Sequence, residues 1–267
     1  MGYILVTDTG KVVAFDGGTI HDAELFRELL ALHGNHLEYW FITHPHHDHY
    51  GVLQAISADP RGITADYLYY SPMDEAQISA DNPHRKDHLT FYSFINSVPF
   101  TIKNPQIGDI FTIDNITIEV MGISNPEITE DVFNNNSCSF MITEKYPDGS
   151  DFKLLILGDS GIAASDKLLA THGKRLKADM VQMAHHGQNA CEKRVYDVIA
   201  PRYSLWPTPD WLWTNTIDPA KPGEGPWKTL IVRGWMEELG STPINSLEKT
   251  AIVHVDNGKV SVEYYKK

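Results

Sequence analysis

Four histidines and an aspartate crowd into the segment Thr43–Gly51, which reads T-H-P-H-H-D-H-Y-G and is called the histidine loop below. Imidazole and carboxylate groups together are the ligands that zinc-like divalent ions prefer. Side chains two residues apart in an extended backbone point to the same side, so His44 and His46 can reach one ion. Asp48 and His49 follow where the chain turns and can serve a second ion. The spacing therefore predicts a site for divalent metal.

An apolar strand is expected to deliver the histidine loop. The run Tyr39–Ile42 comes directly before it, and Pro45 and Gly51 indicate a loop rather than a continuing strand. A hairpin over 3–15 and a helix over about 19–32 are expected ahead of this strand. Ligands would then lie at the carboxyl end of a strand, where open α/β sheets place their chemistry.

Alternating strands and helices are expected along the rest of the chain. Strands are predicted at 67–70, 107–121, 137–143, 152–157, 180–184, 203–206 and 251–264, and helices at 51–56, 87–98, 162–172, 191–199 and 227–239.

No low-complexity linker divides the chain, so one domain over residues 1–267 is predicted. It would include a helical excursion at about 72–106, near the mouth of the site, and a Trp- and Pro-rich loop at about 207–227. His84 and His88 of the excursion are expected on a solvated helix surface.

Two later strand ends offer further metal ligands. The apolar run 154–157 ends in Gly158 and Asp159, and a carboxylate at that turn could bridge two ions. Another strand ends in His185, His186 and Gly187. One of these histidines should bind the second ion. We assign His185 as the ligand and place His186 nearer the substrate, although the reverse is almost equally consistent with the sequence.

The pattern T-H-x-H-x-D-H-x-G resembles the signature of the metallo-β-lactamase superfamily, and the Gly-Asp and His-His-Gly motifs follow in the same order as in that family. The resemblance implies an α/β fold, a four-layer αββα sandwich of the metallo-β-lactamase type. It also implies that Asp16, at the end of the second strand, supports the histidine loop by holding a ligand imidazole.

One departure from the family narrows the resemblance. Many members carry a metal-ligating histidine where this chain has Asn134-Asn135-Asn136-Ser137. This pattern resembles the hydrolase domain of competence-type DNA-internalisation proteins and related phosphorylcholine esterases. The missing ligand implies open metal positions for water or substrate oxygen.

The resemblance implies a hydrolase with two divalent ions, zinc by default, with manganese or iron also compatible with the ligands. An ion-activated water would attack a phosphodiester or phosphorylated ester. A lactone, thioester or amide hydrolase, or a metal-binding module without catalysis, is the alternative. The predicted metal ligands are His44, His46, Asp48, His49, Asp159 and His185. Asp48 and His186 are the predicted catalytic residues, and Asn135, Asn136, Ser137, Trp211 and Trp213 the candidate substrate contacts.

Composition limits the partners. The apolar fraction of 42% is ordinary for a folded protein, and the formal net charge of −13 disfavours a non-specific grip on long nucleic acid. A small or cell-wall-type phosphoester is therefore the expected substrate. Cys138 and Cys191 are expected to be buried thiols. There is no signal peptide or membrane span in the sequence, so a cytoplasmic location is the default expectation, subject to a trimmed natural N-terminus. The oligomeric state is left open.

Overall fold

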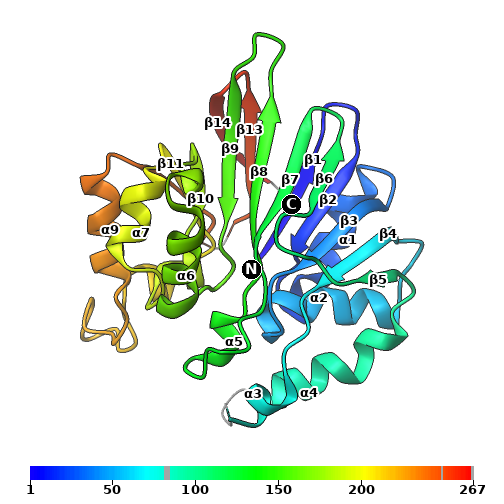
Figure 1. Cartoon of the computed structure of the whole chain (residues 1–267), viewed down its shortest axis with the longest axis horizontal. Helices are drawn as coiled ribbons and strands as arrows, with labels where there is room; N and C mark the ends of the chain where they lie inside the picture. Colours follow the sequence, from blue (N-terminus) through cyan, green and yellow to red (C-terminus); the bar gives the residue numbers. More distant parts are fainter. Residues whose placement is uncertain (81–84, 248, 266–267) are drawn as a thin grey trace. The chain divides into compact units, whose positions relative to one another are not determined.

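The computed structural model describes residues 1–80, 85–247 and 249–265, which form two compact units. Unit 1 comprises residues 1–109 and 122–138, and unit 2 comprises residues 110–121 and 139–267. Each unit has its own sheet and helices (Figure 1). The sequence-based assignment of a single domain stays a prediction.

The sheet of unit 1 has the strand order β1-β2-β3-β4-β5. Its first two strands pair antiparallel as the expected hairpin, and the rest pair parallel. Parallel strands lie with both faces covered, which explains the nearly continuous burial of the apolar runs. The fifth strand was not predicted from the sequence, because it is short and exposed. The bounds are β1 Gly2–Val6, β2 Val12–Asp16, β3 His36–Ile42, β4 Thr64–Tyr70 and β5 Thr101–Lys103.

Helices with apolar stripes cover the core of this sheet. Phe26 and Leu30, four residues apart, are buried on the first long helix, and Phe26 stacks on Trp40 of β3. The helices of the unit are η1 Ile20–Asp22, α1 Ala23–Ala31, α2 His47–Ala58, α3 Glu75–Ala80, α4 Arg85–Phe94, η3 Ile95–Ser97 and α5 Val132–Asn135.

Helix α2 begins earlier than the sequence indicated. The prediction started it at Gly51, whereas the structure starts it at His47. The backbone N–H groups of His49 and Tyr50 already donate to the carbonyl of His46, so the metal-binding pattern itself supplies the first turn. Gly51 has a packing role, because a Cβ there would lie 2.4 Å from the backbone nitrogen of Ile20. The glycine lets α2 lie directly on the chain that follows β2.

Helix α4 of the excursion is partly buried, which corrects the expectation for His88. Its side chain is only 7% exposed, and its ring lies 4.1 Å from that of Tyr92 and 6.0 Å from that of Phe133. The prediction was wrong because α4 is rich in polar residues, although one face of the helix packs on α2 and β4. His84 lies outside the described residues.

Acid sensitivity should follow from the burial of His88. Burial lowers the pKa of His88 to about 4, below the ordinary value of about 6.5. Between these pH values the unfolded chain takes up a proton that the folded chain does not, so stability falls as the pH drops through this window. His88→Phe keeps the ring packing and should lose less melting temperature between pH 7 and pH 5 than the wild type. Equal losses in both proteins would contradict this, and exposed His33→Gln is the control.

The sheet of unit 2 has the strand order β12-β11-β10-β9-β8-β7-β6. Strands β9 to β12 pair parallel, whereas β6 with β7 and β8 with β9 form antiparallel pairs. A separate hairpin, β13 with β14, follows. The bounds are β6 Ile110–Ile113, β7 Ile116–Gly122, β8 Ser139–Lys145, β9 Asp151–Ile156, β10 Met180–Gln182, β11 Tyr203–Trp206, β12 Thr242–Asn245, β13 Ala251–Asp256 and β14 Lys259–Tyr264.

Helices gather beside the parallel end of this sheet and close the second core (Figure 1). Val195 and Ile199, buried on one face of a helix, show the expected spacing. No helix in the described ranges is long and apolar enough to cross a membrane. The helices are α6 Ile162–His172, η4 Gly173–Leu176, η5 Ala184–Gly187, α7 Lys193–Ile199, α8 Asp210–Trp213 and α9 Thr229–Glu238.

Candidate metal centre

The histidine loop in unit 1 is buried and its rings converge. His44 and His46 follow β3, and His44 Nε2 lies 2.9 Å from His46 Nδ1. His49, from the first turn of α2, is fully buried, and its ring centroid lies 4.1 Å from that of His44. Phe133 of α5 stacks on the ring of His46 at 5.3 Å. The strand and helix thus bring three imidazoles to one place, and their assignment as metal ligands stays a prediction.

Asp16 makes the contact expected of it. Its carboxylate, fully buried, accepts hydrogen bonds from His49 Nδ1 at 2.8 Å, from the Thr43 backbone N–H at 2.7 Å and from the Thr43 hydroxyl at 2.8 Å. A donor on Nδ1 leaves Nε2 of His49 as the basic nitrogen that can bind metal. Asp16 adopts a left-handed backbone with φ of 56°, which costs energy for a residue with a Cβ. Its effect on metal binding stays a prediction.

Thr43 is a part of this arrangement that the sequence analysis did not assign. Its hydroxyl donates to Asp16 and lies 3.1 Å from His44 Nδ1, so it can accept from that imidazole while donating to the carboxylate. The signal was available, because a threonine directly before the first histidine is part of the pattern that was recognised.

Asp48 lies at the start of α2 beside His49. Its carboxylate is about one third exposed, and Asp48 Oδ2 lies 3.7 Å from His49 Nε2. A half-exposed carboxylate next to a buried imidazole has both the charge for a metal ion and the access for a proton. The geometry therefore suits Asp48 for the two roles that the sequence predicted.

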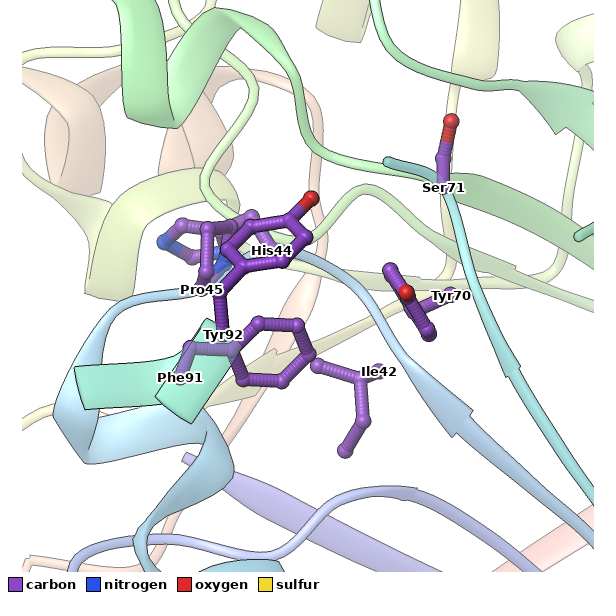
Figure 2. Close-up of a pocket in the computed structure, with 7 residues that line it drawn as sticks. All are labelled: Ile42, His44, Pro45, Tyr70, Ser71, Phe91 and Tyr92. Atoms are coloured by element: carbon purple, nitrogen blue, oxygen red, sulfur yellow. The ribbon is translucent and has the colours of Figure 1, made fainter. Parts of the chain in front are cut away.

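The helical excursion borders a narrow pocket beside His44 (Figure 2). The pocket is too narrow to enclose a water molecule. Two of its three hydroxyl groups are engaged, because the Ser71 hydroxyl donates to Ser124 and the Tyr92 hydroxyl accepts from the Met73 N–H. Most of its surface is apolar and lies next to a predicted metal ligand. The lining residues are Ile42, His44, Pro45, Tyr70, Ser71, Phe91 and Tyr92.

In unit 2, two strand ends bring a carboxylate and two imidazoles together. Asp159, only 1% exposed, follows β9, and the histidine pair follows β10. Asp159 Oδ2 lies 3.4 Å from His186 Nε2 and 4.0 Å from His185 Nε2. His186 is thus the nearer of the two, while its assignment as substrate contact and that of His185 as ligand stay predictions.

The backbone of the histidine pair is left-handed over three consecutive residues. His185 and His186 have φ of 49° and 57°, and Gly187 has φ of 81°. Such a conformation costs roughly 1–2 kcal/mol for each residue that carries a Cβ. Gly187 is also required by space, since a Cβ would lie 2.2 Å from the ring of Trp206. Strain of this kind persists where a site needs side chains in a fixed direction.

Backbone carbonyls fix the rings of the pair. Nδ1 of His186 lies 2.9 Å from the carbonyl of Pro207, and Nδ1 of His185 lies 3.2 Å from that of Asn189. An imidazole that donates from Nδ1 presents a basic Nε2. Both rings therefore turn the nitrogen suited to metal or substrate toward Asp159.

The asparagine side chains of the segment 134–137 form hydrogen bonds within their own loop. Asn135 donates to the carbonyl of Glu130, and Asn136 donates to that of Val132, while the Asn136 side-chain oxygen accepts from the Asn125 N–H. Both side chains, like Ser137, are at least 97% buried. Their amides hold the loop that carries Phe133, and the predicted contact of Asn135, Asn136 and Ser137 with substrate stays a prediction.

The Trp- and Pro-rich loop is anchored to the histidine pair, since the Thr208 hydroxyl donates to the carbonyl of His186. Trp213 packs edge-on against Trp206 and has the Arg233 guanidinium 4.0 Å above its ring, so it holds the loop. Trp211 is 49% exposed and contacts Trp227. Of the two predicted substrate contacts, Trp211 has the free surface.

Each unit carries imidazole and carboxylate side chains of the kind that bind divalent ions. His44, Asp48 and His49 in unit 1, and Asp159 and His186 in unit 2, are among the residues whose donor atoms could hold a metal ion. Nitrogen and carboxylate donors of this kind match zinc and its neighbours. Residues 3–130 match the model of the family described as the metallo-beta-lactamase superfamily. This match covers the first 130 residues, over which the chain resembles the metallo-β-lactamase superfamily.

Solved structures with this fold resemble the chain at low sequence identity. The metallo-beta-lactamase fold protein YhfI from Bacillus subtilis is 16% identical over 98% of this chain and 91% of that chain, with a TM-score of 0.53. Metallo-beta-lactamase GOB-18 from Elizabethkingia meningoseptica is 18% identical over 67% and 68%, with a TM-score of 0.43. MIM-1 from Novosphingobium pentaromativorans is 16% identical over 67% and 68%, with a TM-score of 0.44. No curated protein matches the sequence. The family match and the YhfI likeness confirm the α/β class of metallo-β-lactamase type.

Proposed function

We propose that this chain is a member of the metallo-β-lactamase superfamily and a metal-dependent hydrolase of phosphodiesters or phosphorylated esters. Proteins of this superfamily are mainly metal-dependent hydrolases, which supports the reaction type. The observation that carries the proposal is the fixed orientation of His49 by Asp16, and of His186 by the Pro207 carbonyl. Each of these contacts turns Nε2 toward a carboxylate, 3.7 Å from Asp48 for His49 and 3.4 Å from Asp159 for His186, which is the pairing of donors that a divalent ion needs. A polar loop without function has no need of such supports.

The family resemblance implies that the predicted ligands would bind a pair of divalent ions. We assign His44 and His46 to one ion, and Asp48, His49 and His185 to the other, with Asp159 as the bridge. Zinc is the expected metal, and manganese or iron fit the same donors. When bound, such ions lower the pKa of water to about 7 and polarise a phosphoryl or carbonyl oxygen.

The residues of the chain would then position the reactants. Asp48, partly exposed, can accept the proton that the attacking water gives up. His186, whose Nδ1 donates to the Pro207 carbonyl, can as the imidazolium also donate a hydrogen bond from Nε2 to a phosphoryl oxygen or to the leaving group. No serine or cysteine nucleophile is needed. Both cysteines are buried, and burial raises the pKa of each to about 12, so neither is a thiolate at neutral pH.

The substrate class rests on the resemblance to the competence-type and phosphorylcholine esterase branch and on charge. A net charge of −13 makes a long polyanion a poor partner, whereas a small phosphoester needs only the local charge of the ions. We therefore place a small or cell-wall-type phosphoester ahead of long nucleic acid. A carboxylic ester or amide, such as a lactone, thioester or β-lactam, is the second candidate, because metal ions that activate water for attack on phosphorus also polarise a carbonyl oxygen.

Metal content and turnover of the purified protein test this proposal. We expect about two ions per chain after loading with zinc or manganese, and turnover of bis(p-nitrophenyl) phosphate or p-nitrophenyl phosphorylcholine that chelation removes and metal restores. Lactone or β-lactam turnover without phosphodiester turnover would overturn the substrate class. Fewer than one ion per chain, together with no turnover of any substrate, would overturn the proposal that the chain is an enzyme. The remaining interpretation would be a binding module without catalysis.

A further inference from the structure

The end of strand β10 carries a buried side-chain amide that joins both metal-site turns of unit 2. Gln182 is 0% exposed and is the last residue of the strand. We propose that Gln182 is a positioning residue: it holds the turn of Asp159 and the turn of His185 and His186 in a fixed relation. This inference rests on the proposed function, because it assigns those three side chains to a metal centre.

All four hydrogen-bonding positions of the Gln182 amide are used. Its oxygen accepts from the backbone N–H groups of Leu157 at 2.9 Å and Gly158 at 2.8 Å. Its nitrogen donates to the backbone carbonyls of Gly158 at 3.0 Å and Met183 at 2.7 Å. A primary amide has two acceptor lone pairs and two donor hydrogens, so none is left over.

The backbone explains why a side chain is needed at this point. Strands β9 and β10 pair in register at Met180 with Leu154 and at Val181 with Leu155. Beyond that pair the strands separate, and the N–H groups of Leu157 and Gly158 would be buried without partners. Gln182 supplies those partners in place of the backbone of β10. A buried N–H left unmatched costs about 1–3 kcal/mol.

Gly158 is where the two turns meet. Its carbonyl accepts from Gln182 and also from the backbone N–H of His185 at 3.2 Å. Asp159 is the next residue, so any movement of this peptide changes the distances of 3.4 and 4.0 Å between the carboxylate and the two imidazoles. Metal ligands must be held within a few tenths of an ångström. Gln182 is thus placed to control that geometry without touching a metal ion or substrate itself.

Only an amide of this length satisfies the site. Methionine has nearly the same shape but would leave two N–H groups without an acceptor, the Met183 carbonyl without the Gln182 donor, and the Gly158 carbonyl with only the His185 N–H. Glutamate can accept from both N–H groups, but once ionised it repels the carbonyls of Gly158 and Met183. A buried carboxyl facing carbonyl oxygens has a raised pKa. In Gln182→Glu, therefore, the protonated form at low pH can still donate to one carbonyl, whereas the ionised form at high pH donates to neither.

The test compares Gln182→Met, Gln182→Glu and the wild type in cobalt titrations followed by visible absorption. We expect Gln182→Met to bind the more weakly held ion about 10- to 100-fold less tightly, with a changed cobalt spectrum and a folded circular dichroism signal. The loss of cobalt affinity in Gln182→Glu, relative to wild type, should grow as the pH rises. The loss of cobalt affinity in Gln182→Met should not depend on pH in this way. Wild-type affinity and spectrum in Gln182→Met would overturn the proposal.

A control separates positioning from general destabilisation. Val195→Ala empties part of the same buried core on α7 and lowers stability without a hydrogen bond to either turn. If its melting temperature matches that of Gln182→Met, Val195→Ala should keep the cobalt affinity of the wild type. A loss of affinity equal to that of Gln182→Met would mean that Gln182 acts only through stability, and would overturn the proposal.

A second measurement covers the case in which wild-type protein binds no metal and the proposed function fails. In metal-free protein, ring-nitrogen NMR signals of His185 and His186 should shift or broaden in Gln182→Met, while that of His172, whose Nε2 bonds the Met121 carbonyl, stays. Unchanged signals for the histidine pair would overturn the positioning role by itself.

Discussion

Replacing Asp159 by alanine should abolish hydrolysis while leaving the fold in place. The carboxylate is 1% exposed and lies 3.4 Å from His186 Nε2, so it is the one negative charge that the described part of unit 2 places among the histidine pair. Without it, ions assigned to this site lose their shared anionic ligand, and the attacking water loses its activation. We expect kcat/KM to fall by roughly 10³-fold or more, with at most one ion retained per chain.

The stability of this variant should move in the opposite direction to its activity. A buried carboxylate is costly to desolvate, and its removal from a metal-free site relieves that cost. The melting temperature of metal-free Asp159→Ala should therefore equal or exceed that of metal-free wild type. Asp148→Asn, which changes an exposed turn carboxylate of the same unit, is the matched control and should keep activity and metal. Two bound ions and full activity in Asp159→Ala would show that the bridging assignment is wrong.

Asp16→Asn should weaken metal binding about 10- to 100-fold by changing which nitrogen of His49 carries the proton. Asparagine tolerates the left-handed backbone at φ of 56° and keeps the size of the side chain. Its amide, however, has to face both the Thr43 hydroxyl and His49 Nδ1, which now donate to a carboxylate. If the amide nitrogen faces His49, the imidazole must accept on Nδ1 and place its proton on Nε2, which removes the metal-binding lone pair.

Isothermal titration with zinc and activity measurements check this prediction. Asp16→Ala should be worse, because it leaves the donors of Thr43 and His49 buried without an acceptor and strains the backbone. Asp74→Asn, on an exposed carboxylate of the same unit, should behave as wild type. Unchanged zinc affinity in Asp16→Asn would mean that the buried carboxylate serves the fold and not the ligand.

His88 and Gln182 show where sequence reasoning stopped. The polar neighbours of His88 suggested a solvated surface, and only the contacts of its ring with Tyr92 of the same helix and with Phe133 of α5 showed that the imidazole is buried. Gln182 looked like an ordinary residue in an apolar strand. Its role depends on the two strands separating after Val181, which is a property of the sheet and leaves no mark in the local sequence.

The sequence by itself indicated which side chains of this protein could bind a metal ion. Ligand types and spacing, as in His44-x-His46-x-Asp48-His49, are local properties, and a strand that ends in such a pattern has little freedom in where it points the side chains. The same holds for the strands that end at Asp159 and at His185. These motifs were enough to indicate the family and the α/β class, because hydrophobic periodicity also reports local structure.

Tertiary structure alone decided which groups hold the ligands in place. The bonds from His49 to Asp16, from His186 to Pro207 and from Gln182 to Gly158 join residues that are 33, 21 and 24 positions apart. No periodic pattern connects residues at such separations, since they meet only when strands and turns pack. The sequence names the ligands because their chemistry is intrinsic, whereas the geometry of the centre comes from the fold because hydrogen bonds depend on distance and direction.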